Sequence, residues 1–111
     1  MTTLTSAILL LRRGRQLITL PEHWTQEAFA RDKLGYGVGS DDERAVCFCS
    51  TGALNQPWFK KEFDTDTYNF AFQALRREMG GTIAGFNDTH THAEVLAAWD
   101  KAILKLEELA K

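Results

Sequence analysis

The chain has 111 residues, of which 44% are hydrophobic and 25% are charged, and its net charge is −2. These proportions are typical of a folded globular domain and exclude a disordered chain, and the length predicts one domain over residues 1–111. Because the chain has no surplus of lysine and arginine, a role built on phosphate contacts is disfavoured, and nucleic acid is not an expected partner.

The apolar runs and the two cysteines bear on where the protein works. No apolar run approaches the roughly 20 residues that cross a bilayer. The N-terminal apolar run precedes its arginines, the reverse of the order in a secretory signal. Cys47 and Cys49 are one residue apart, a spacing that rarely suits a disulfide, which indicates a reducing compartment. We therefore expect a cytoplasmic protein with no membrane partner.

The first segment with helical periodicity covers residues 5–20. Leu4, Ile8, Leu11 and Ile18 follow one helical stripe. Gly14 lies in the middle of the segment, where glycine is unfavourable by about 1 kcal/mol relative to alanine, and it indicates that another element packs closely there. Pro21 ends the segment.

Two further helices are expected on either side of a glycine-rich connector at residues 35–39. The first is a short helix over residues 24–34. The second covers residues 40–56, because Ser40 and Glu43 have the spacing of a capping box. The run at residues 45–49 is also acceptable as a buried strand, but the capping signal and the small residues after it favour a helix.

The last two helices are expected at residues 66–79 and from residue 91 to the C-terminus. Gly80 and Gly81 end the former, and Thr91 with Glu94 forms a second capping box at the start of the latter. Residues 82–90 between them predict an irregular loop. The sequence thus predicts a mostly α fold, a compact single-domain bundle of about five helices with an irregular loop before the C-terminal helix.

Several short motifs of the chain resemble a family of small uncharacterised bacterial and phage-encoded proteins. The family pattern contains Trp-Cys-Gln-Gly-Ala, Ala-Arg-Asp, Cys-x-x-Gly-Ala-Leu, Trp-Asn-Asp and Thr-x-x-Glu-Val-Leu. The matching positions here are Trp24, Gln26, Ala28, Ala30 to Asp32, Cys49, Gly52 to Leu54, Ile83 to Asp88, Thr91 and Glu94 to Leu96. The resemblance implies no activity, but it directs attention to Arg31-Asp32 and Asn87-Asp88. Thr25, Glu27 and Phe86 depart from the pattern, which has cysteine, glycine and tryptophan there.

A zinc site would need ligands from Cys47, Cys49, His90 and His92. Structural zinc sites usually space their cysteines by two to four residues and their histidines by three to five, whereas each pair here encloses a single residue. We therefore predict no metal and no cofactor, and Cys49, His90 and His92 remain only weak candidates as ligands.

An acid–base site would use Asp88, His90, His92 and Glu94, which crowd the start of the last helix. A histidine beside a carboxylate can act as a general base, but carboxylates at a helix start are usually caps. Cysteine chemistry is disfavoured because Cys49 lies in the most apolar stretch, where a thiol stays protonated. No residue is named as catalytic.

The aromatic stretch after Pro57 has two interpretations. It either folds back to cap the core or forms an exposed patch for a protein partner. The candidate interaction residues are Trp58, Phe59, Lys60, Lys61 and Phe63, together with Arg31, Asp32, Asn87 and Asp88. The preferred hypothesis is a non-enzymatic protein-interaction module with a partner of unknown identity. The alternative is a small metal-dependent or acid–base enzyme that uses the Asp88, His90, His92 and Glu94 cluster. The oligomeric state is left open.

Overall fold

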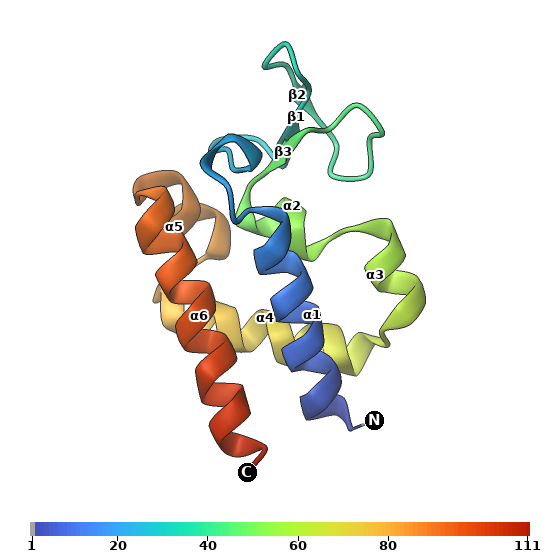
Figure 1. Ribbon diagram of the computed structural model, residues 1–111, viewed down its shortest axis with the longest axis vertical. Helices are drawn as coiled ribbons and strands as arrows, with labels where there is room; N and C mark the ends of the chain where they lie inside the picture. The colour runs from blue at the N-terminus through green and yellow to red at the C-terminus, as the bar shows by residue number, and fades with distance from the viewer. Residues whose placement is uncertain (1) are drawn as a thin grey trace.

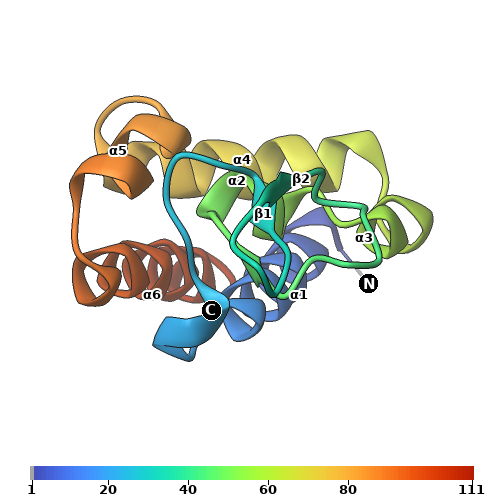
Figure 2. The ribbon, with the colours of Figure 1, turned by 90° about the horizontal axis from the view of Figure 1, so that it is seen from above.

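Three long helices form the frame of the molecule in a computed structural model that describes residues 2–111. They are α1 (Thr3–Leu17), α4 (Thr65–Met79) and α6 (His92–Leu109). Helices α1 and α6 lie side by side, and α4 crosses behind both of them (Figure 1), so that two layers are visible from above (Figure 2). We call these three helices the helical bundle. Its interior is apolar, and the fully buried side chains include Leu10, Leu11, Leu75, Val95 and Trp99.

The ends of these helices follow local capping rules. The predicted capping box of α6 is present, because Thr91 accepts from the Glu94 backbone N–H while Glu94 accepts from that of Thr91. Gly80 ends α4 in a left-handed conformation with φ of 72°, as the sequence predicts. Asp64 caps the start of α4 and accepts from the backbone N–H of Thr67 at 2.8 Å. No helix within residues 2–111 is both long enough and apolar enough to cross a membrane.

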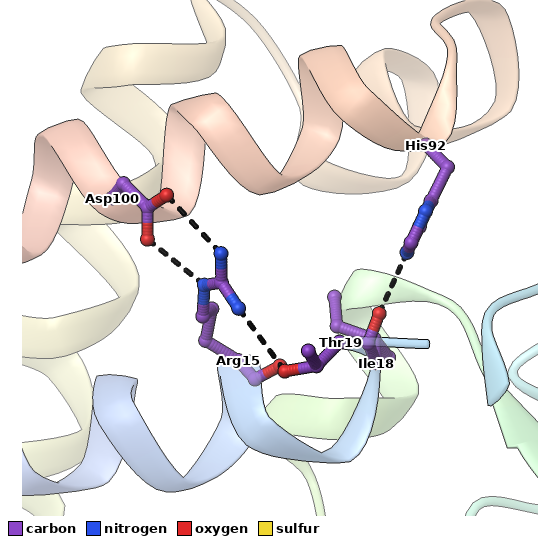
Figure 3. Close-up of polar contacts among 5 residues, drawn as sticks. All are labelled: Arg15, Ile18, Thr19, His92 and Asp100. Atoms are coloured by element: carbon purple, nitrogen blue, oxygen red, sulfur yellow. Dashed lines mark hydrogen bonds and ion pairs between the residues drawn. The ribbon is translucent and has the colours of Figure 1, made fainter. Parts of the chain in front are cut away.

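Close packing and polar contacts join α1 to α6. A Cβ atom at Gly14 would lie 2.8 Å from the Trp99 ring, which is the close approach that this glycine predicts. Arg15 forms a two-pronged ion pair with Asp100, with nitrogen–oxygen distances of 2.8 and 3.2 Å (Figure 3). His92 Nε2 donates to the Ile18 carbonyl at 2.7 Å, which satisfies a carbonyl at the end of α1.

The segment after α1 departs from the helical expectation. A short 3₁₀ helix, η1 (Pro21–His23), leads into β1 (Ala30–Arg31), β2 (Gly37–Val38) and β3 (Cys47–Phe48). The three strands form one antiparallel sheet in the order β2-β1-β3, with Ala30 opposite both Val38 and Phe48. We call residues 24–49 the sheet arm, and Figure 1 shows that it projects from one end of the helical bundle.

The predicted helix over residues 24–34 is therefore wrong, because its polar side chains fold the chain back on itself. Asp32 Oδ1 accepts from the backbone N–H groups of Leu34 and Tyr36, and this closes the turn between β1 and β2. The predicted helix over residues 40–56 is wrong in its first half. In place of a capping box with Glu43, Ser40 donates through its hydroxyl to the distant Asn55 carbonyl. The strand alternative at residues 45–49 holds for β3.

Three short helices complete the fold: α2 (Ser50–Leu54), α3 (Pro57–Glu62) and α5 (Ile83–Thr89). Helix α3 occupies most of the aromatic stretch that begins after Pro57. Helix α5 replaces the irregular loop predicted over residues 82–90, because Thr82 caps it by accepting from the Gly85 N–H at 2.9 Å. The mostly α class is confirmed, and the errors concern residues 24–49 and residues 82–90.

Candidate functional site

One buried side chain, Asn87 of α5, is at the centre of the contacts that join the sheet arm to the helices, and it is 0% exposed. Its Oδ1 atom accepts from Trp24 Nε1 at 2.8 Å and from the backbone N–H and hydroxyl of Ser50, both at 2.9 Å. Its Nδ2 atom donates to the Thr25 carbonyl at 3.0 Å. Trp99 Nε1 donates to the Ser50 hydroxyl at 3.1 Å, which connects the bundle core to the same group. We call these five residues the Asn87 network.

The backbone of α5 is held from the arm as well. Gln26 Nε2 donates to the carbonyls of Asn87 and His90, each at 3.0 Å, where a helix end leaves its carbonyls unpaired. Asp88 Oδ1 accepts from the Glu27 N–H at 2.9 Å. Glu27 has a φ of 63°, a left-handed conformation that favours glycine, and the pattern described above has glycine at this position.

Arg31 and Asp32 hold the arm together internally. The Arg31 guanidinium donates to the Thr25 hydroxyl at 2.9 Å, the Gln26 carbonyl at 2.9 Å and the Gly35 carbonyl at 3.0 Å. Asp32 closes the adjacent turn. All four residues that the resemblance singled out, Arg31, Asp32, Asn87 and Asp88, therefore make specific contacts that hold the arm in place.

Cys49 caps α2 beside this network. Its Sγ atom accepts from the Gly52 N–H at 3.3 Å, and burial raises the pKa of the Cys49 thiol above its usual value. Its backbone N–H donates to the Phe29 carbonyl at 3.1 Å. The thiol is therefore protonated at neutral pH and poorly suited to act as a nucleophile. A pocket of about 340 Å³ lies next to it, lined by Glu27, Ala28, Phe29, Cys49, Ala84 and Asp88.

The candidate acid–base and metal residues have separate neighbours. His90 Nδ1 lies 2.9 Å from the Phe86 carbonyl, and its ring stacks on that of Phe86 at 3.6 Å. His92 holds the end of α1. The Thr91 N–H donates to Glu94 and lowers the pKa of this carboxyl. Within residues 2–111, no three histidine, cysteine or acidic side chains are grouped closely enough to hold a metal ion.

The aromatic stretch on α3 largely covers the core. Phe59 is only 2% exposed, whereas Trp58 is 40% exposed. The Arg13 guanidinium lies 5.6 Å from the centre of the Trp58 ring and 5.8 Å from that of Phe63, and Arg13 also pairs with Glu62. Lys60 and Lys61 are exposed. Phe59 and Asn87, two of the residues expected in an exposed patch, thus lie in the interior.

Comparison with known proteins identifies the family but no function. The family model described as "Family of unknown function (DUF6197)" matches residues 2–105. The chain belongs to this family. No curated protein and no solved structure matches the chain. The DUF6197 match extends from the start of α1 well into α6 and so includes the sheet arm and the Asn87 network.

This DUF6197 chain exposes apolar side chains on its arm that the sequence analysis missed. Leu34 is 74% exposed, Tyr36 67%, Phe29 58% and Val46 47%. Leu34 and Tyr36 occupy the turn between β1 and β2, while Phe29 and Val46 flank β1 and β3. Phe29 lies within residues 24–34, where a helix was expected, and its exposure follows from its place beside β1. The glycines around Tyr36 were the one local sign of a projecting turn.

Proposed function

We propose that this DUF6197 protein is a non-enzymatic interaction module that presents its sheet arm to a protein partner. The observation that carries the proposal is the exposure of Phe29, Leu34, Tyr36 and Val46 on one small element. Aromatic side chains such as Phe29 and Tyr36 are enriched at protein interfaces, and the removal of the neighbouring Leu34 and Val46 from water would add binding free energy. All four lie in the turn of the arm or directly beside its two-residue strands, so they are concentrated in one short segment of the chain.

The rigid attachment of the arm supports the same proposal. The Asn87 network and the Arg31 guanidinium fix the arm by hydrogen bonds that do not involve its exposed apolar side chains. An interface that is ordered before binding loses less conformational entropy when the partner arrives. The arrangement therefore suits recognition by a preformed surface.

The charge of the arm indicates what the partner looks like. Asp41 and Glu43 are exposed in the loop that leads to Val46, while Asp42 in the same loop is paired with Arg44 at 2.8 Å. Lys33 beside Leu34 is also exposed, so the charges around the apolar surface are mixed with an acidic excess. Such a surface is matched by an apolar depression with more basic than acidic residues around it. We expect the association rate with such a partner to fall as the salt concentration rises.

The competing hypotheses have less support from the contacts. On α3, Trp58, Lys60 and Lys61 remain a second surface, although Arg13 covers part of the aromatic cluster. The acid–base enzyme has no supporting geometry, since His90, His92 and Glu94 each make separate structural hydrogen bonds.

A comparative pull-down tests the proposal. Tagged wild-type protein, a Leu34→Ser/Tyr36→Ser arm variant and a Trp58→Ala/Lys60→Glu/Lys61→Glu α3 variant are each incubated with lysate of the native host. We expect a protein that the wild type and the α3 variant capture equally and that the arm variant loses by at least about tenfold, the effect of removing interface anchors. The captured protein is then purified and titrated against all three.

Both arm positions are solvent-exposed, so the arm variant should keep its circular dichroism spectrum and melting temperature, and this is the folding control. Equal capture by the arm variant and the wild type would remove the arm from consideration. Loss with the α3 variant alone would assign binding to α3. No specific capture by any of the three proteins would count against the interaction role.

A further inference from the structure

The outward stripe of α4 combines apolar and charged side chains in one row. Asp66, Phe70, Gln73 and Arg77 are spaced by four, three and four residues, so they lie on one face of the helix. All four are exposed, while Thr67, Ala71 and Leu75 on the opposite face are buried against the bundle. Phe70, at the centre of the stripe, is 42% exposed.

A groove runs beside this stripe. It has a volume of about 480 Å³ and lies where α4 meets the first residue of α1 and the last turns of α6. Phe70 and Leu109 both line it, and Leu109 is 68% exposed. Two large apolar side chains are thus left in contact with water on the same surface. In Figure 1 the C-terminal end of α6 lies at the opposite end of the molecule from the sheet arm.

The two charges at the ends of the stripe have no ionic partner within residues 2–111. The ion pairs among these residues include neither Asp66 nor Arg77. Their basic members are Arg12, Arg13, Arg15, Arg44 and Lys105. Asp66 lies in the first turn of α4 and Arg77 in the last. Eleven residues at 1.5 Å each separate them by about 16 Å along the helix axis.

This stripe is complementary to itself. If two α4 helices lie antiparallel about a two-fold axis, Asp66 of each copy faces Arg77 of the other, and Phe70 of each faces Gln73 of the other. The two-fold axis thus forms two equivalent ion pairs with an apolar contact between them. Both copies use the same surface, as closed dimers require. We propose that the outer face of α4, with Phe70 at its centre and Asp66 and Arg77 at its ends, is the contact surface for a second copy of this chain.

The size of the surface sets the strength of the contact. A single 15-residue helix and the adjoining groove bury an area at the low end of specific interfaces, below about 1,200 Å², so the dimer is weak and reversible. Figure 1 shows α4 behind α1 and α6 and the sheet arm at one end of the bundle, so the arm is not part of the proposed contact surface. This inference does not depend on the proposed binding role of the arm.

Charge reversal at either end of the stripe provides the test. Untagged full-length wild type, Asp66→Lys and Arg77→Glu are compared by sedimentation velocity over a series of concentrations at low salt. Each substitution places like charges opposite each other twice in the symmetric dimer. We expect the dissociation constant of the dimer to rise at least about tenfold for each variant. Lys101→Glu, an exposed charge reversal on α6, is the matched control and should behave as the wild type.

An equimolar mixture of the two variants is decisive. In a mixed dimer the new lysine faces the new glutamate, and the native Arg77 of one copy faces the native Asp66 of the other, so association should return. If Asp66 and Arg77 serve only the helix dipole, both variants lower the melting temperature while the wild type and the variants sediment alike, and the proposal is overturned. A wild type that remains monomeric at several hundred micromolar also overturns it, as does a mixture that associates no more than its components.

Discussion

The helical bundle and the sheet arm depend on different kinds of interaction. Along α1, α4 and α6 the buried side chains are almost all apolar, and the free energy comes from the removal of a large apolar area from water. In the arm only Ala30 and Cys49 are buried apolar residues, and hydrogen bonds from Asn87 and Arg31 fix the chain. We therefore expect the bundle to resist the loss of any one polar group, whereas the arm depends on a few.

The largest effect is expected at the junction of the two regions. In Gly52→Ala, the new Cβ would lie 2.1 Å from the Phe29 carbonyl oxygen, a backbone atom that cannot turn aside. Phe29 must move away from α2, and the hydrogen bond that its carbonyl accepts from the Cys49 N–H is then strained or lost. We expect a loss of about 3 kcal/mol or more in the free energy of unfolding, measured by urea denaturation.

Gly14→Ala is the matched control, because it introduces the same methyl group within the bundle. There the new Cβ meets the edge of the Trp99 ring at 2.8 Å, so we expect a smaller loss of about 1–3 kcal/mol. The near-UV circular dichroism signal of Trp99 should change in this variant, while the amide protons of the arm keep their protection from exchange. If Gly52→Ala were as stable as the wild type, the tight junction between α2 and β1 would be contradicted.

The next effect concerns the polar network itself. Asn87→Ala leaves Trp24 Nε1, the Ser50 N–H and the Thr25 carbonyl without their partner in a buried site. Each unsatisfied buried group costs about 1–3 kcal/mol, and partial relaxation should limit the total loss to about 3 kcal/mol. We expect the arm to detach first, with faster amide exchange at residues 24–49 and preserved protection in α1, α4 and α6, as read by hydrogen-exchange mass spectrometry.

Asn69→Ala, at an exposed position on α4, is the control and should change stability by no more than about 0.5 kcal/mol. Uniform loss of protection over bundle and arm in Asn87→Ala would mean that the two regions unfold as one unit. That result would contradict the expectation that the arm opens while the bundle stays folded.

The same difference explains how much could be predicted from the sequence. The bundle follows local rules: the stripes of α1, α4 and α6 repeat at helical spacing, and the caps at Gly80 and Thr91 lie next to the helices that they end or begin. The helix predicted to begin at residue 40 was wrong because a capping box is a local pattern, and at residues 40–43 other contacts replace it. There, Asp42 turns back on its own Arg44, and Ser40 donates to the distant Asn55.

The candidate site was predictable only in part, because its contacts are distant in sequence. Trp24 and Asn87 are 63 residues apart, and Ser50 and Trp99 are 49 apart. The resemblance directed attention to Asn87 and Asp88, but no spacing rule connects Ser50 to either of them. The exposure of Tyr36 and Leu34 followed from a turn that the helical interpretation of residues 24–34 did not contain.

The smallest effect is a difference in acid response between the two regions. Backbone N–H groups of Thr67 and Thr91 hold the pKa values of Asp64 and Glu94 below their ordinary values of 3.8 and 4.5. In the arm, the hydrogen bond from the Arg44 side chain lowers the pKa of Asp42 to about 2. Since all three pKa values are lowered by folding, the stabilisation is complete above the ordinary values and is lost as the pH falls through the folded ones.

Neutral variants at these positions separate the two responses. Asp64→Asn and Glu94→Gln should lower the melting temperature of the whole protein at pH 7 and flatten its decline below the ordinary pKa values of 3.8 and 4.5. The wild type and the variants should converge once the pH falls below the lowered pKa values of the folded protein. Asp42→Asn should leave the global melting temperature nearly unchanged and raise amide exchange only around residues 39–46, because its partner Arg44 lies in the same exposed loop. A global change in Asp42→Asn would show that the loop is coupled to the bundle, and the arm would then be more than a surface attachment.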